Sequence, residues 1–267
     1  MGIGIRPSRV LYAATMIGLG ITGFVNGGLA LVWQHIPLQH VPGEQAISYV
    51  CASVEFLCGL GLLFRKTLTL AVRILFPYMM LWALLLKLPV VFLLPLNIDS
   101  WGTFGEIAII VAGAWCLFAS HAGAWEKQRL GVLAGERGIR WARLLLVICL
   151  PMEGMVHFLN IQNVADFVPA WLPFHLAWAY LTGAGFMAAA AGMFFGVLPR
   201  LAANLLAFMV GCIALFTWGV LLDTGRTACT AFLISAAIGA SVWLVADTYR
   251  GTPWFAVGKV ARSVSLD

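Results

Sequence analysis

The sequence contains unusually little charge. Only 10% of the 267 residues are charged, whereas 62% are hydrophobic. A soluble globular protein needs roughly 25% charged residues to cover its surface. The apolar excess is too large for one soluble core to bury. The composition therefore excludes a water-soluble domain and predicts an integral membrane protein.

Motifs of several enzyme classes are also missing. There is no Walker-type phosphate loop and no G-x-S-x-G elbow, so phosphoryl transfer and serine hydrolysis lack their usual evidence. The six cysteines form no C-x-x-C pair and lie within or beside apolar runs, which assigns them to packing. A metal site needs three or four suitable ligands, and no such cluster occurs, so we predict none.

Eight apolar stretches are long enough to cross a hydrocarbon core roughly 30 Å thick. Because little chain lies outside them, and backbone groups in lipid need partners within their own segment, each is predicted to be helical. The first stretch is too long for a signal peptide and is expected to remain as a spanning helix. We therefore expect an all-α polytopic membrane protein with eight transmembrane helices, at residues 10–33, 47–64, 68–94, 102–120, 140–160, 173–197, 200–222 and 228–247.

Basic residues are distributed unevenly about these spans. All 16 lysines and arginines except Lys87 and Arg226 fall within or beside the segments on the side of the N-terminus. The positive-inside rule therefore predicts that both termini are cytoplasmic. The net charge of +5 needs no nucleic acid, because the bases lie between apolar spans and beside anionic headgroups. The lipid bilayer is the expected partner.

The two halves of the chain are similar to each other. A shift of 131 positions overlays several identical residues, including Gly23 on Gly154 and Tyr49 on Tyr180. An even number of helices per copy makes such a repeat parallel. We expect one four-helix unit over 1–120 and a cytoplasmic linker over 121–139. A second unit, with a cytoplasmic tail, follows over 140–267.

Polar residues within the first unit are candidates for a site. Glu55 and Lys87 lie about eight residues from the outer ends of their predicted helices, or roughly 12 Å deep. Asn26, about seven residues before the predicted end of the first helix, falls at a similar level, and Glu106 is shallower. Ionisable groups inside lipid are costly unless they are paired or face a cavity.

Two interpretations of this layer remain open. In the first, Lys87 and a glutamate form a buried ion pair that holds the helices in register without any ligand. In the second, the layer lines an outward-opening pocket where Lys87 and a carboxylate contact the polar head of an amphipathic molecule such as a quinone.

The second unit does not repeat this set of residues. The positions equivalent to Glu55 and Lys87 hold Phe186 and Trp218. Instead, Glu153 and His157 lie four residues apart near the outer surface, on one face of a helix. This spacing permits a mutual hydrogen bond that would tune the imidazole for proton transfer.

Short motifs in both units are similar to a known family. They are G-M-V-H-F at 154–158, V-P-A-W-L-P at 168–173, W-A-Y-L-T-G at 178–183, K-L-P at 87–89 and W-x-x-F-G-E at 101–106. The chain resembles a tandem pair of the four-helix units of the DoxX family of bacterial membrane proteins. The resemblance implies a bacterial inner-membrane location, in a family named after subunits of a thiosulfate:quinone oxidoreductase. It supplies no agreed catalytic set.

Three functions follow as hypotheses. The first is a non-catalytic or accessory subunit of a membrane complex, with a protein partner. The second is a quinone-binding subunit of a redox system, in which a partner supplies the electrons. The third is a carrier of small solutes or lipids, since a parallel repeat of eight helices is compatible with alternating access. The candidate ligand-binding residues are Asn26, Glu55, Lys87, Glu106, Glu153 and His157.

Overall fold

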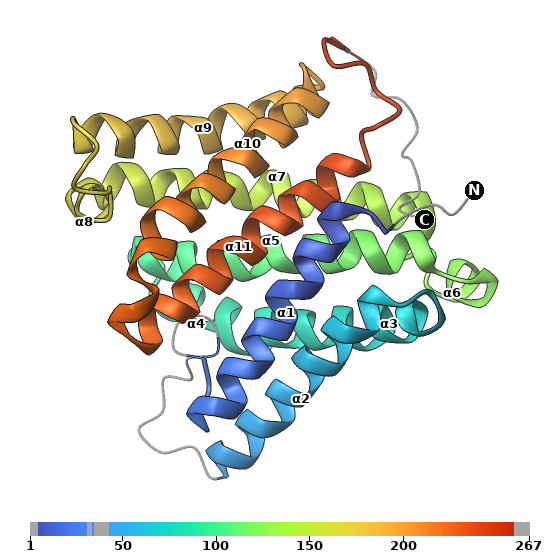
Figure 1. Ribbon diagram of the computed structural model, residues 1–267. Helices are drawn as coiled ribbons and strands as arrows, with labels where there is room; N and C mark the ends of the chain where they lie inside the picture. Colours follow the sequence, from blue (N-terminus) through green and yellow to red (C-terminus); the bar gives the residue numbers. More distant parts are fainter. Residues whose placement is uncertain (1–4, 31–33, 35–42, 259–267) are drawn as a thin grey trace.

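Helices form all of the elements named in the computed structural model, which describes residues 5–30, 34 and 43–258 (Figure 1). The all-α prediction is thus confirmed for this part of the chain. The α-helices are α1 Pro7–Asn26, α2 Glu44–Leu63, α3 Arg65–Trp82, α4 Leu88–Leu93, α5 Ile98–His121, α6 Ala124–Arg129, α7 Gly135–Leu159, α8 Ile161–Asp166, α9 His175–Phe195, α10 Pro199–Ile213 and α11 Arg226–Asp247. Between them lie the π-helices η1 Ala83–Lys87 and η2 Ala214–Trp218 and the 3₁₀-helix η3 Gly219–Thr224.

Eight helical segments in the described residues are long and apolar enough to cross a membrane. Six of them are the single helices α1, α2, α5, α7, α9 and α11. The other two are continuous runs, one formed by α3, η1 and α4 over Arg65–Leu93 and one that starts with α10 and covers Pro199–Leu222. The chain is therefore a multi-pass membrane protein, as predicted, and seven of the eight predicted stretches match the helices to within a few residues.

The predicted end of the first span is wrong. The helix was expected to run to residue 33, but α1 ends at Asn26. Gly27 adopts a left-handed backbone conformation with φ of 60°, and its N–H donates to the carbonyl of Gly23 at 3.0 Å. Glycine enters this conformation without the steric penalty of a side chain, so it ends helices in this way.

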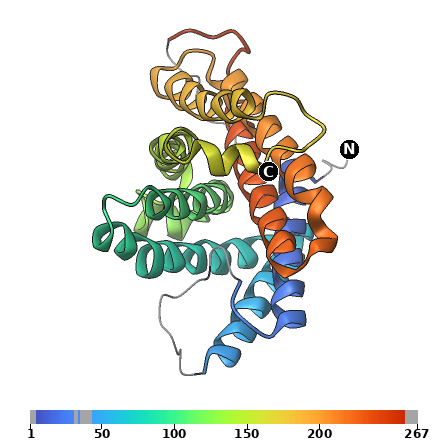
Figure 2. The same ribbon diagram turned by 90° about the vertical axis from the view of Figure 1, so that its left-hand side faces the viewer.

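The central helices are α5 and α11, whose side chains are the most buried among the spans. Helix α5 packs against α3, α7 and α11, and α11 also packs against α1 and α10. The outer neighbours are α1 with α2, α2 with α3, α7 with α9, and α9 with α10. Figures 1 and 2 show the first four spans, blue to teal, on one side of the molecule and α7 and α9, green to yellow, on the other.

Several local features recur at the predicted shift of 131 positions. The π-helices at Ala83–Lys87 and Ala214–Trp218 are related by it. So are the residues that precede α2 and α9, Gly43 and Phe174, which both have left-handed backbones with φ of 70° and 58°. The same shift relates α1 to α7 and α5 to α11. The contact of α5 with α7 therefore has an equivalent in the contact of α11 with α1. Helix α6 lies within residues 121–139, and the division of the chain into two parallel units joined by a linker stays a prediction.

The start of α1, the end of α11 and the short helix α6 all lie at one end of the bundle (Figure 1). We call it the α6 end. Helices α4 and α8 lie at the opposite end. Beyond α11 the chain returns to the turn between α9 and α10, where Leu198 N–H donates to the Ala256 carbonyl at 2.8 Å and Gly258 N–H donates to the Gly196 carbonyl at 3.1 Å.

Candidate functional site

Three ionisable side chains from both halves gather where α5 packs against α7. Lys87 ends the π-helix η1, Glu106 lies on α5 and Glu153 lies on α7. Lys87 interacts electrostatically with Glu106, and Glu106 interacts with Glu153. The side chains of Lys87 and Glu153 are only 6% and 7% exposed. We call these three residues the charged cluster; it contains two carboxyl groups and one amine.

The π-helix sets the position of Lys87. A π-turn inserts one extra residue per turn into an α-helix and occurs often at functional sites. Pro89 follows two residues later, and its ring disfavours regular α-helical geometry in the preceding turn. In the second half, the residue equivalent to Lys87 is Trp218, whose ring packs against Phe167 with centroids 4.9 Å apart. The first half therefore has a charge where the second has an aromatic pair.

Two glycines allow α5 and α7 to approach closely at the charged cluster. A Cβ atom on Gly102 would lie 2.7 Å from a methyl group of Val156, and one on Gly105 would lie 2.6 Å from Oε1 of Glu153. Real Cβ contacts are not this short, so a side chain at either position would force Val156 or Glu153 to move. The pair of glycines thus brings the Glu153 carboxylate against the backbone of α5.

The carboxylate of Glu153 is incompletely satisfied. Its Oε1 is buried and has no hydrogen-bond partner of normal geometry among the described residues, and the one group that acts on the carboxyl by a hydrogen bond is the backbone of Glu106. Leaving a buried polar atom unpaired costs about 1–3 kcal/mol, more when the group is charged. Such a group marks a place where a proton or a hydrogen-bond donor on a ligand would be stabilised.

His157 lies one turn from Glu153 on α7, but the predicted bond between the two side chains does not form. The Nδ1 atom of His157 instead lies 2.9 Å from the backbone carbonyl oxygen of Glu153. Its ring packs on Phe186 with centroids 5.3 Å apart. The Glu153 carboxylate points toward α5 rather than toward the imidazole. The imidazole therefore contacts the backbone carbonyl one turn earlier in α7.

Glu55 belongs to a second group of polar residues, between α2 and α3. Its Oε1 accepts hydrogen bonds from Nε2 of Gln34 at 2.6 Å and from the hydroxyl of Tyr78 at 2.7 Å. Gln34 Nε2 also lies 3.0 Å from the Tyr78 oxygen, and Gln34 Oε1 accepts from the N–H of Ala30. The side chain of Glu55 is 2% exposed. This arrangement satisfies the carboxylate and anchors Gln34 to the bundle.

The predicted single layer of four residues is therefore divided. Asn26 is the last residue of α1 and its side chain is exposed, so the expectation that it lies deep within the first span is wrong. The Asn26-Gly27-Gly28 sequence was the available signal, since glycine commonly follows the last helical residue. Lys87 and Glu106 do come together, as predicted, and Glu153 joins them from the other half.

Sequence reasoning missed Gln34 and Tyr78, both of which are neutral. A search for charges inside apolar spans does not find them. The signal for Tyr78 was a hydroxyl within a span, because such a group needs a partner in lipid.

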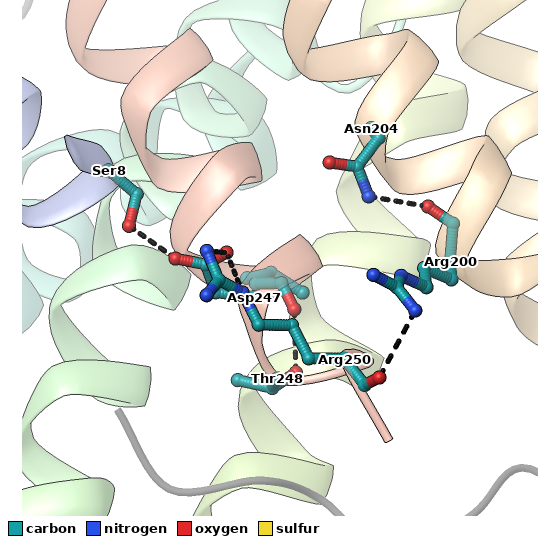
Figure 3. A network of polar contacts seen from close by, with 7 residues as sticks. Ser8, Arg200, Asn204, Asp247, Thr248 and Arg250 are labelled. Atoms are coloured by element: carbon teal, nitrogen blue, oxygen red, sulfur yellow. Dashed lines mark hydrogen bonds and ion pairs between the residues drawn. The ribbon is translucent and has the colours of Figure 1, made fainter. Parts of the chain in front are cut away.

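A further polar network closes the α6 end of the bundle (Figure 3). Ser8 Oγ on α1 donates to Oδ2 of Asp247 at 2.6 Å, and Arg250 forms an ion pair with Oδ1 at 2.8 Å. Arg143 on α7 donates to the hydroxyl and the carbonyl of Thr248. The end of α11 is thus tied to both halves, through groups that the sequence analysis did not single out.

Aromatic rings complete this network. The guanidinium carbon of Arg143 lies 3.8 Å from the centre of the Tyr249 ring, and that of Arg200 lies 4.1 Å from the centre of the Trp254 ring. Burial raises the pKa of Tyr249 above its ordinary value, and the opposing effect of Arg143 is smaller. Arg200 also donates to the carbonyls of Arg250 and Thr252. Asp247 and the guanidinium groups of Arg143, Arg200 and Arg250 are all partnered within the protein, which is typical of a structural network.

Within the described ranges, no group of three or more His, Cys, Asp or Glu residues is placed to hold a metal ion. The charged cluster contains an amine, which donates hydrogen bonds, and two carboxyl groups, which accept them. These are the interactions that bind a polar head with both donor and acceptor atoms.

Comparison with known proteins adds one partial match. A family model described as a domain of unknown function, DUF8561, matches residues 145–227, which run from α7 through α10 to the start of α11. No curated protein and no solved structure matches the chain. The candidate site must therefore be judged on its own chemistry.

Proposed function

We propose that this protein binds the polar head of an amphipathic molecule of the quinone class at the charged cluster, as the membrane subunit of a redox system. The observation that carries the proposal is the buried, unpartnered Oε1 of Glu153 beside Glu106 and Lys87. A quinol hydroxyl would donate to Glu153, and the amine of Lys87 would donate to a quinone oxygen. A protein partner would exchange electrons with the bound molecule.

The geometry favours a ligand over a purely structural ion pair. A stable buried pair needs its remaining lone pairs satisfied by further hydrogen bonds. The Glu55 carboxylate meets this condition through Gln34 and Tyr78. The Glu153 carboxylate does not meet this condition, because its Oε1 has no partner among the described residues. Two glycines nevertheless hold α5 close to it. The resemblance to the DoxX family points to the same class of ligand.

The second candidate function is a non-catalytic accessory subunit in which the charged cluster is structural. It is favoured by one observation: Lys87 and Glu106 come from the first half of the chain, and Glu153 comes from the second. In that case the cluster holds the two halves in register, and a partner protein docks elsewhere on the bundle.

A binding titration separates the two candidates. Protein in mild detergent is titrated with a short-chain, water-soluble quinol while tryptophan fluorescence is recorded. Glu153→Gln replaces the carboxyl group that accepts the hydroxyl and is expected to weaken binding about tenfold, the value of roughly one hydrogen bond. Glu136→Gln, an exposed carboxylate at the opposite end of α7, is the matched control. Equal affinity for wild type and Glu153→Gln, with both folded, would favour the structural candidate.

The proposed location is the bacterial inner membrane, with both ends of the chain in the cytoplasm. The α6 end of the bundle carries Arg6, Arg65, Lys127 and Arg200 in or beside its turns and helix starts. This asymmetry supports a cytoplasmic orientation of that end. A fluorescent protein that folds only in the cytoplasm, fused after residue 267, should be fluorescent. A periplasmic phosphatase at the same position should be inactive, and the reverse pattern would overturn the orientation.

A further inference from the structure

The side chain of Arg9, in the first turn of α1, is buried, and no carboxylate among the described residues acts on it. It is 5% exposed, and its Nε has no hydrogen-bond partner among the described groups. The charged groups that act on it are Arg6 and Arg65, which are both cationic. A buried guanidinium beside like charges is strongly unfavourable unless an anion neutralises it.

Other arginines at the same end of the bundle are provided with partners by the fold. Arg73 pairs with Glu126 at 2.5 Å, and Arg250 pairs with Asp247 at 2.8 Å. Arg143 donates to Thr248. Even the half-exposed Arg73 and Arg250 have carboxylate partners, and the buried Arg143 has Thr248. Among residues 5–30, 34 and 43–258, no such partner reaches the buried Nε of Arg9, which is therefore a candidate for a ligand.

The backbone at this position also favours an anion. Arg6 is the N-cap residue of α1, and no side chain caps the helix. Pro7 has no N–H, while the N–H groups of Ser8 and Arg9 lie in the first turn, where the helix supplies no acceptor. The hydroxyl of Ser8 is already committed to Asp247. The positive end of a helix of 20 residues therefore adds to the charges of the arginines.

We propose that Arg6, Arg9 and Arg65 bind a phosphate group, and that its source is the headgroup of an anionic phospholipid. The planar guanidinium matches two phosphate oxygens at once, which makes arginine the preferred residue for such a group. The site lies at the α6 end of two spanning helices, α1 and α3, where lipid headgroups surround the bundle. It is separate from the charged cluster, and neither proposal depends on the other.

The second half carries an equivalent pair of bases. Arg137 and Arg140 are related to Arg6 and Arg9 by the shift of 131 positions. Together with Lys127 they line a cavity of about 480 Å³ at the start of α7. The R-x-x-R pattern at the start of both first helices is consistent with a phosphate contact in each half.

Thermal unfolding in detergent tests the proposal. The midpoint Tm is measured with phosphatidylglycerol, with diacylglycerol, which has no phosphate, and with inorganic phosphate, at low salt because screening weakens such contacts. Phosphatidylglycerol is expected to raise the Tm of the wild type, and Arg9→Gln should lose the rise. Arg129→Gln removes the same charge from exposed α6 and should keep it. A rise of Tm with inorganic phosphate alone would assign the site to free phosphate rather than to lipid.

Direct binding gives an independent readout. Native mass spectrometry should show phosphatidylglycerol bound at least about tenfold more weakly to Arg9→Gln than to the wild type. Arg9→Lys, which keeps the charge without the planar fork, should be intermediate. If Arg9→Gln fails to fold, Arg65→Gln, whose side chain is exposed, replaces it. Equal binding by wild type and variants, or an equal response to diacylglycerol, would overturn the proposal.

Discussion

Glu153 on α7 lies so close to Gly105 on α5 that a methyl group on the glycine would approach its Oε1 to 2.6 Å. The two residues come from different halves of the chain. Their contact places a buried carboxylate at the seam between the halves, beside Glu106. The closeness of the two helices and the chemistry of the charged cluster are therefore linked.

Replacing Gly105 with alanine tests this closeness. The added methyl group should displace the Glu153 carboxyl group from its place beside α5, at a cost of about 1 kcal/mol, the low end for overpacked interiors because the displaced atom ends a flexible side chain. The Tm in detergent is expected to fall. Gly211→Ala is the control, because its methyl group would meet nothing within 4 Å and alanine favours the helix. An unchanged Tm for Gly105→Ala would show that the Glu153 carboxyl group is not held against α5.

Replacing Ser8 with alanine tests the closure of the α6 end. The change removes the 2.6 Å bond to Asp247, which joins α1 to α11. A hydrogen bond to a charged group contributes about 1.5–3 kcal/mol, so the free energy of unfolding should decrease by that order. Ser53→Ala, which affects only a bond to the Tyr49 carbonyl within α2, should change it by less than about 0.5 kcal/mol. Similar effects of both changes would argue against a role for Asp247 in joining the helices.

Replacing Tyr78 with phenylalanine tests the second polar group. Glu55 and Gln34 would each lose a partner, and a buried carboxylate that loses a hydrogen bond costs about 1–3 kcal/mol. The variant is expected to unfold at a lower temperature. Tyr180→Phe serves as the control, because that side chain is 51% exposed on α9. Equal Tm values for the two variants would contradict the bonded arrangement of Glu55.

Acidification is expected to weaken the contact of α6 with α3. Burial raises the pKa of Glu126, but the N–H groups of Glu126 and Gly123 and the guanidinium of Arg73 lower it more, so the pKa lies below its ordinary value. The contact therefore stabilises the folded protein fully at pH values above the pKa of Glu126 in the unfolded chain, about 4.3. This stabilisation is lost as the pH falls through the lower pKa of the folded state.

Measurement of Tm from about pH 7 to about pH 3 checks this sign. The Tm of Glu126→Gln should fall less steeply in acid than that of the wild type, because the variant has no carboxylate to protonate. Glu136→Gln, an exposed carboxylate of the same region, should retain the wild-type slope. A steeper acid slope in Glu126→Gln would reverse the assigned direction.

Much of the fold was predictable because the membrane imposes a simple rule on sequence. A span needs about 20 apolar residues, so hydropathy alone located the helices. The end of α1 was missed because apolar residues continue beyond Asn26, while the left-handed Gly27 ends the helix. Backbone conformation at a single glycine is a local effect that hydropathy does not register.

The site was predicted only in part because packing brings residues together across the two halves. Lys87 and Glu106 lie on consecutive spans, and their similar depth was sufficient to pair them. The sequence predicted a hydrogen bond between Glu153 and His157 because the two share a helix face. The carboxylate of Glu153 turns toward Gly105 instead. Which helix faces α7 is determined by the assembled bundle, and one sequence does not reveal it.

The central claim is that the charged cluster holds an amphipathic molecule. The most direct measurement is solvent extraction and mass spectrometry of small molecules retained by protein purified in mild detergent, with wild type compared with Lys87→Met and with Lys127→Met as a control at the α6 end. The account predicts a quinone or related amphiphile at close to one per chain in the wild type and the control, and its loss in Lys87→Met. Only bulk lipid in all three proteins, with Lys87→Met still folded, would contradict the account.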